Sequence, residues 1–223
     1  MFRTITLSFL ASVALAGCAG PGGRLPRGVR PIANPSAIVA TELAFAREAQ
    51  EKGQWTAFAK YAADGAVMFE PQPVNAKDWL KKQANPAQAV AWQPYSVWMS
   101  CDGSLAVSKG AWQRPNGMVG YFTTVWRRQK DGGYKWTLDQ GDTLPQPLKA
   151  PEMISGVVAD CSRARPPAVP PAAAGVEQRV GWSDDRTLEW TADVRPDGSR
   201  TFVVKRWTGS GYEEAVRSEV AAG

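Results

Sequence analysis

The chain has 223 residues, a formal net charge of +5 and no histidine. This length suits one domain, or one domain with an appendage. Histidine is the side chain whose unperturbed pKa best suits proton transfer near neutrality, so any general base must be a carboxylate whose pKa is raised by burial. The sequence contains no glycine-rich phosphate loop, serine triad or cysteine–histidine cluster. We therefore expect neither a cofactor nor a metal.

The first 17 residues are predicted to be a targeting signal. Arg3 precedes an uncharged apolar run over residues 5–16, which is shorter than the ~20 residues that span a bilayer. The stretch Leu-Ala-Gly-Cys, which ends at Cys18, resembles the lipobox of bacterial lipoproteins. The resemblance implies cleavage before Cys18, lipid attachment to it and anchoring in a membrane, and Ala19 favours the periplasmic face of the outer membrane. The alternative is an ordinary secretory signal with an incidental cysteine. No nucleic-acid partner is expected for an exported, anchored chain.

Two further cysteines, Cys101 and Cys161, remain after Cys18. An even number of cysteines in an oxidising compartment favours a disulfide between them. The alternative is a pair of separate buried thiols.

Residues 18–35 are rich in Gly, Pro and Arg, which predicts a flexible tether. A helix is expected to begin near residues 35–36, with Ile38, Glu42, Phe45 and Ala49 on one side and Leu43 widening its apolar face. A second short helix is expected near residues 55–62. It is followed by a strand at 66–71 and a surface helix at 75–84.

From about residue 90 the pattern changes to β-branched and aromatic residues, interrupted by turn signals. These turns predict four antiparallel strands at 90–101, 104–114, 118–130 and 133–142. Residues 161–175 form a proline-rich linker. Residues 176–223 alternate as a small β-meander, which we expect to pack on the main sheet because it is too small to be stable alone.

Two stretches, "ELAFAREAQEKGQWTAFAKYAADGAVMF" and "GYFTTVWRRQKDGGYKWTLDQGD", resemble the nuclear transport factor 2-like (SnoaL-like) superfamily. The resemblance covers about residues 36–145 and implies a domain at 36–160. Its fold would be α+β, a cone-shaped curved antiparallel sheet wrapped on N-terminal helices, with a pocket in the open mouth. Dimers are common in the superfamily, so a homodimer stays open.

The superfamily includes isomerases and cyclases that place an acid or base in this pocket. The available carboxylates are Asp64, Glu70, Asp139 and Asp142, of which Asp139 and Asp64 are the candidate catalytic residues. Their alternative role is turn capping and solvation of strand ends.

Ten tryptophans are many for this length. The aromatic residues expected to line a ligand pocket are Trp92, Trp112, Tyr121, Trp126 and Trp136, although a plain core role would explain them as well. Two functions follow. The favoured one is a non-catalytic, lipid-anchored envelope protein that binds a small apolar or aromatic ligand or acts as an interaction module. The other is an isomerase-like or cyclase-like enzyme that uses a pocket aspartate as general base.

Overall fold

The computed structural model describes residues 32–164 and 171–222. The predicted signal peptide, Cys18 and part of the proline-rich linker lie outside the described residues. Among the helices described, none is both long and apolar enough to cross a membrane.

The first helix, α1 (Pro35–Lys52), begins at Asn34, whose side chain accepts a hydrogen bond from the Ser36 amide at 3.1 Å. It ends at Gly53, whose φ of 101° suits glycine. Its buried residues are Ile38, Glu42, Phe45 and Ala49, which confirms the predicted face. Leu43 was expected to widen that face, but it is 46% exposed because it lies on the solvent side of the helix.

Two shorter helices follow, α2 (Gln54–Tyr61) and α3 (Ala76–Leu80). The helix predicted at 75–84 is shorter than expected, since only two isolated turn bonds, at Lys82 and Gln83, continue it beyond Lys81.

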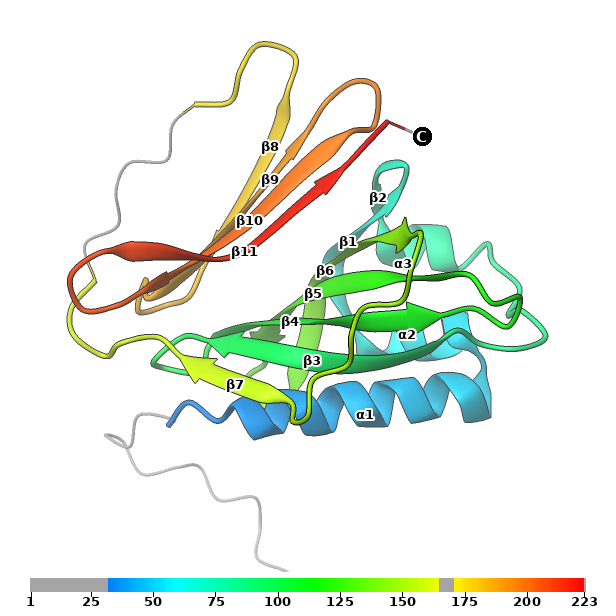
Figure 1. The fold of residues 1–223 in the computed structure, drawn as a ribbon, viewed down its shortest axis with the longest axis horizontal. Coiled ribbons are helices and arrows are strands. Elements are labelled where there is room, and N and C mark those ends of the chain that lie inside the picture. Colours follow the sequence, from blue (N-terminus) through cyan, green and yellow to red (C-terminus); the bar gives the residue numbers. More distant parts are fainter. Residues whose placement is uncertain (1–31, 165–170, 223) are drawn as a thin grey trace, which may run out of the picture. The chain divides into compact units, whose positions relative to one another are not determined.

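The main sheet has seven strands in the order β2-β1-β6-β5-β4-β3-β7 (Figure 1). Their bounds are β1 (Ala62–Glu70), β2 (Gln72–Asn75), β3 (Ala91–Met99), β4 (Leu105–Gln113), β5 (Val119–Arg128), β6 (Tyr134–Leu144) and β7 (Ser155–Val158). The four predicted strands are present as the antiparallel meander β3–β6. Strand β1 starts earlier than predicted, and β2 and β7 were not predicted. The fold is α+β, as expected.

A second sheet has the order β11-β10-β9-β8, with bounds β8 (Glu177–Trp182), β9 (Leu188–Val194), β10 (Arg200–Trp207) and β11 (Tyr212–Val220). It packs on one face of the main sheet through an apolar core that includes Val107, Val125 and Leu138 on one side and Leu188 and Phe202 on the other. The other face of the main sheet packs on the helices. The main sheet is therefore buried on both faces.

The predicted disulfide joins Cys101, just after β3, to Cys161, just after β7, with their Cα atoms 5.2 Å apart. It closes a separation of 60 residues in the sequence, so it restricts the unfolded chain considerably. It also fixes the start of the segment that leads to the second sheet.

The first hairpin turns of the two meanders, β3–β6 and β8–β11, have the same construction. Residues 100–105 read Ser-Cys-Asp-Gly-Ser-Leu and residues 183–188 read Ser-Asp-Asp-Arg-Thr-Leu. In each turn the serine amide donates to the leucine carbonyl at 2.9 Å. In each, the serine hydroxyl donates to the aspartate Oδ1 at 2.7 Å. The next turns also correspond, Arg-Pro-Asn-Gly at 114–117 and Arg-Pro-Asp-Gly at 195–198. The meander β8–β11 thus repeats the turn pattern of β3–β6.

These two turns bind each other reciprocally. The Asp102 amide donates to Asp185 Oδ2 at 2.8 Å, and the Asp185 amide donates to Asp102 Oδ2 at 3.0 Å. On either side, the Cys101 amide donates to Thr187 Oγ1 and the Asp184 amide to Ser104 Oγ, both at 2.9 Å. The contact has local twofold symmetry and links the two sheets at this end.

We expect Asp102→Ala and Asp185→Ala each to lower the free energy of unfolding by about 1–3 kcal/mol, because each removes a charged acceptor of several hydrogen bonds. Each variant breaks the same reciprocal contact, so the double variant should lose about 1 kcal/mol less than the sum of the two. Urea denaturation measures all three values.

The matched control is Asp197→Ala, since among the described contacts the Asp197 side chain accepts hydrogen bonds only from Ser199 of its own exposed turn. Strict additivity of the two losses would show that the turns do not act as a unit.

Candidate functional site

The site lies where two strands of the main sheet separate. The parallel pairing of β1 with β6 runs from Ala62–Trp136 to Val67–Leu138, and no further pair between them follows in the described structure. Beyond that point β1 continues to Glu70 and β6 to Leu144. A cavity of about 290 Å³ opens beside the separated ends and is lined by residues of both strands.

Aromatic side chains form one wall of this cavity. They come from helices α1 and α2 and from four strands, and are Phe45, Trp55, Phe58, Phe69, Trp92, Trp112 and Phe122. Trp92 packs edge-to-face on Phe45 at 4.8 Å and on Phe58 at 5.8 Å between ring centroids. These contacts hold the rings in fixed orientations. Several keep part of their surface uncovered, so the wall is available to an apolar molecule.

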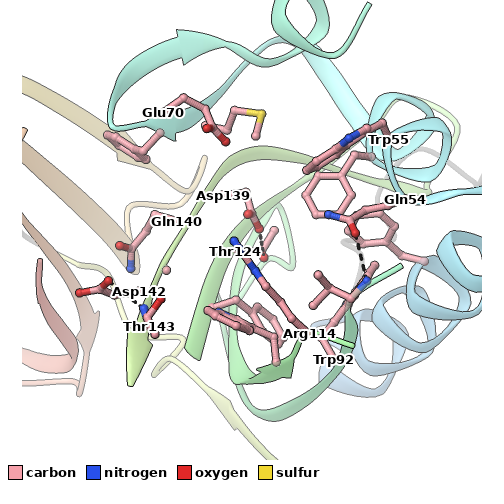
Figure 2. A pocket seen from close by; sticks show the side chains of 18 of the residues that line it. Gln54, Trp55, Glu70, Trp92, Arg114, Thr124, Asp139, Gln140, Asp142 and Thr143 are labelled. Carbon is pink, nitrogen blue, oxygen red and sulfur yellow. Dashed lines mark hydrogen bonds between the residues drawn. The ribbon is translucent and has the colours of Figure 1, made fainter. Parts of the chain in front are cut away.

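Asp139 lies in the middle of the cavity, between this aromatic wall and a polar end (Figure 2). The hydroxyl of Thr124 donates to Asp139 Oδ2 at 2.6 Å. Burial raises the pKa of Asp139 from 3.8 to about 6, and the Thr124 hydrogen bond and the charge of Arg200 only partly offset it. A carboxyl with this pKa can accept or donate a proton near neutral pH.

A β-bulge directs Asp139 into the cavity. Opposite Val125 and Trp126 the strand β6 pairs through Leu138 and Trp136, which leaves Thr137 as an extra residue. Trp136 therefore packs in the core beneath the helices, while Leu138 packs against the second sheet. The bulge reverses the alternation of β6 side chains between the two faces of the sheet. Asp139 therefore lies on the face that is covered by the helices.

The polar end of the cavity contains Gln140, Asp142 and Thr143 of β6 together with Arg200 of the second sheet. Figure 2 shows Gln140, Asp142 and Thr143 on the opposite side of Asp139 from Trp55 and Trp92. Glu70 and Arg114 also line the cavity. A ligand would thus meet rings at one end and hydrogen-bonding groups at the other.

Behind the aromatic wall lies a second acid, Glu42 of α1, which is fully buried. Its carboxyl accepts hydrogen bonds from Ser108 Oγ at 2.5 Å, Trp126 Nε1 at 3.0 Å and Trp92 Nε1 at 3.2 Å. The pKa of Glu42 is raised from 4.5 to about 7, chiefly by burial and to a lesser extent by the negative charge of Asp139, and the hydrogen bonds only partly offset this rise. The bond to Trp92 fixes an indole that lines the cavity.

Three of the predicted site residues lie at the cavity: Trp92, Trp112 and Asp139. The other predicted ring residues do not line it. Trp126 and Trp136 are fully buried in the core, and Tyr121 is buried elsewhere on β5.

Asp64 does not fit the expected role of a base inside the pocket. Its side chain is 99% exposed and pairs with Lys77 at 2.6 Å. The hydrogen bond from Lys77 lowers the pKa of Asp64, which is the opposite of what a general base near neutrality requires.

Sequence reasoning missed Glu42 and Arg200 as residues at or beside the site. The signal for Glu42 was visible, because a lone acid shares the apolar helix face with Ile38, Phe45 and Ala49. Such a position predicts a buried carboxyl with a raised pKa. Arg200 gave no local signal. In residues 32–164 and 171–222, no group of three or more His, Cys, Asp or Glu side chains could hold a metal ion.

No protein-family model matches the chain, and no curated protein matches it. Among solved structures, a candidate ketosteroid isomerase from Parabacteroides distasonis is 17% identical with a TM-score of 0.41, over 52% of this chain and 98% of its own. A candidate aromatic ring hydroxylase from Novosphingobium aromaticivorans is 15% identical with a TM-score of 0.38, over 51% of this chain and 91% of its own. These likenesses concern the fold alone.

The buried acids predict how stability depends on pH. The folded-state pKa values of Glu42 and Asp139 are raised to about 7 and about 6. The two protonated acids therefore contribute their full stabilisation of the folded chain below their unfolded pKa values. This stabilisation is lost as the pH rises through 6 and 7. We expect the free energy of unfolding of Glu42→Gln, relative to wild type, to increase between pH 5 and 8 by on the order of 2 kcal/mol.

Urea denaturation across this pH range measures the difference. Glu51→Gln, at an exposed position of the same helix, is the matched control. A Glu42→Gln difference from wild type that does not change with pH would contradict a protonated Glu42 in the folded chain.

Proposed function

We propose that this chain is a binding protein of the cell envelope that holds a small apolar or aromatic molecule in the cavity beside β1 and β6. The observation that carries the proposal is an aromatic wall that is rigidly packed but incompletely covered. The volume of about 290 Å³ is near the lower end of the ~300–1,000 Å³ typical of ligand sites. A molecule of about one or two rings suits that volume.

The two kinds of tryptophan in the chain support a ligand role for the wall. Trp126 and Trp136 are fully buried and have the packing of a filled core. Trp55, Trp92 and Trp112 line the cavity and are only partly buried. Leaving large rings partly uncovered is unfavourable unless another molecule covers them.

We also propose that the chain is anchored to a membrane by lipid on Cys18, at the periplasmic face of the outer membrane. The Leu-Ala-Gly-Cys motif supports the anchor, and the Cys101–Cys161 disulfide supports an oxidising compartment. The anchor would hold the ligand-binding domain close to the membrane, where apolar molecules partition.

A second candidate function is proton transfer by Asp139, of the isomerase-like or cyclase-like kind. Asp139 favours it because the carboxyl lies inside the cavity, held by Thr124, with a pKa raised to about 6. In its ionised form it could remove a proton from a carbon next to a carbonyl group of a bound molecule.

Native mass spectrometry of protein extracted from membranes tests the binding proposal. We expect a chain that starts at Cys18 with a lipid mass added, together with an adduct of a small molecule. Trp92→Ala should lose most of the adduct, because it removes a central ring of the wall, and should keep the lipid. Trp190→Ala, a change in the second sheet, is the control and should keep both.

An adduct retained in full by Trp92→Ala, or none in wild type, would contradict ligand binding in this cavity. An unmodified amino end would contradict the proposed lipid anchor on Cys18 but not the proposed ligand binding. The same spectrum reports whether the protein is a monomer or a homodimer.

The second candidate predicts hydrogen–deuterium exchange at the acidic carbon of 2-tetralone, a two-ring ketone, followed by NMR in D₂O. The protein-dependent rate should rise with pH through about 6 and then level off, as Asp139 ionises. Asp139→Asn should lower it by about 10²-fold or more. Asp64→Asn, which changes an exposed carboxylate, should leave it unchanged. An exchange rate that is the same in Asp139→Asn as in wild type would contradict proton transfer by Asp139 and leave only the binding role.

A further inference from the structure

Arg114 places a positive charge at the edge of the aromatic wall. It follows Gln113, the last residue of β4, and lies two positions after Trp112. Side chains two positions apart point to the same face of a strand, and both Trp112 and Arg114 line the cavity. The Arg114 guanidinium lies 5.4 Å from the ring centroid of Trp112, so it stacks on a ring of the wall.

Trp112 is a fixed support for this guanidinium. Its indole lies across Gly120, the residue opposite it on β5, and a Cβ atom at Gly120 would overlap the ring. The Trp112 Nε1 donates to the Tyr121 carbonyl at 2.9 Å. Because these contacts hold the indole, the cation–π contact restricts the Arg114 side chain to this edge of the cavity.

The donors of Arg114 are available to a ligand. No ion pair among the described residues involves Arg114, and the hydrogen bonds described for it are made by its backbone within the turn. Arg200, the other guanidinium of the lining, already donates to Gly141 and Gln140. Arg114 is also exposed, so a ligand can reach it. A guanidinium presents its N–H groups as a planar fork that matches the two oxygens of a carboxylate.

The carboxyls of the lining do not block an anion at Arg114. Asp142 is paired opposite Tyr121, which faces the second sheet, so the Asp142 side chain lies on the other face of the main sheet from Arg114. Glu70 is exposed at the end of β1, where solvent weakens its repulsion of an anion. Asp139, whose pKa is raised to about 6, is largely uncharged in mildly acidic solution.

We propose that the ligand is an aromatic carboxylate, whose rings lie on the aromatic wall and whose carboxylate pairs with the guanidinium of Arg114. This inference rests on the proposed binding function and names the class of molecule that the cavity takes. Arg114 then selects among flat apolar molecules, because a neutral one gains the wall but not the ion pair.

Three probes with the same two-ring frame test the proposal on the purified chain by isothermal titration calorimetry. They are 2-naphthoate (anion), 2-acetylnaphthalene (a neutral ketone of similar shape) and 2-(aminomethyl)naphthalene (cation). Titration at about pH 5.5 keeps Asp139 mostly protonated while an ordinary carboxylic acid is ionised. Wild type should bind 2-naphthoate about fivefold more tightly than the ketone, as one partly exposed ion pair provides, and the cation no more tightly than the ketone.

Variants separate the charge of Arg114 from its cover of the Trp112 ring. Arg114→Met keeps an apolar cover, so it should remove the fivefold preference and leave ketone binding unchanged. Arg114→Lys keeps the charge without the fork and should retain part of the preference. Glu70→Gln should strengthen binding of 2-naphthoate, because Glu70 is an acid on which the charge of Arg114 acts.

The matched control is Arg195→Met. Arg195 has the same position in the corresponding turn of the second meander, is exposed, and lies outside the lining. This variant changes the net charge by the same amount as Arg114→Met and should keep the preference in full.

Equal affinity of wild type for 2-naphthoate and the ketone, or a preference that survives Arg114→Met, would overturn the inference and leave the binding function standing. Tightest binding of the cation, or loss of the preference in Arg195→Met as well, would also overturn it. Failure of all three probes to bind would contradict the proposed function itself, and the inference with it.

Discussion

The separation of β1 from β6 is the constraint on which the site depends. The two strands pair only as far as Val67 and Leu138. If the pairing continued to their ends, β1 would close against Asp139–Thr143 and the cavity would be filled by the sheet itself. Instead β1 turns away and pairs with β2 through residues 67–70. The backbone of β1 beyond Val67 therefore has a partner on one side, and the space on its other side is left to side chains and to a ligand.

Two sets of contacts keep this space open in a chain whose main sheet is buried on both faces. On the helix side, Glu42 holds Trp92 and Trp126 through their indole N–H groups. On the other side, Arg200 contacts Gly141 and the Phe69 ring. The second sheet is itself attached by the disulfide and by the reciprocal Asp102–Asp185 contact. The disulfide and the Asp102–Asp185 contact therefore hold the C-terminal meander in the position from which Arg200 lines the cavity.

Local chemistry predicted much of the fold. The face of α1 followed from the spacing of Ile38, Glu42, Phe45 and Ala49, and the hairpins of β3–β6 followed from their glycine and asparagine turns. The disulfide was predicted from the even number of cysteines that remain after Cys18 and from the oxidising compartment that the signal sequence indicates. The strands β2 and β7 were missed because both are four residues long and lack alternation. The proposed membrane anchor remains a prediction from Cys18.

The site was harder to predict, for a physical reason. A sheet covered on both faces buries every residue of β5 from Gly120 to Trp126, so the aromatic pattern cannot separate the cavity side from the core. Trp126 and Trp136 were expected in the pocket for this reason. The bulge at Thr137 then shifts the alternation of β6, which only tertiary pairing reveals. Arg200 reaches the cavity from 60 residues beyond Gln140, and no local pattern reports such a contact.

The most direct test of a ligand cavity between the separated strands is a crystal structure of the chain soaked with the two-ring ketone 2-tetralone. We expect its rings to lie against Trp92 and Phe58, with β1 and β6 still apart beyond Val67 and Leu138. Strands paired to their ends around a filled interior, or a probe bound elsewhere, would contradict it.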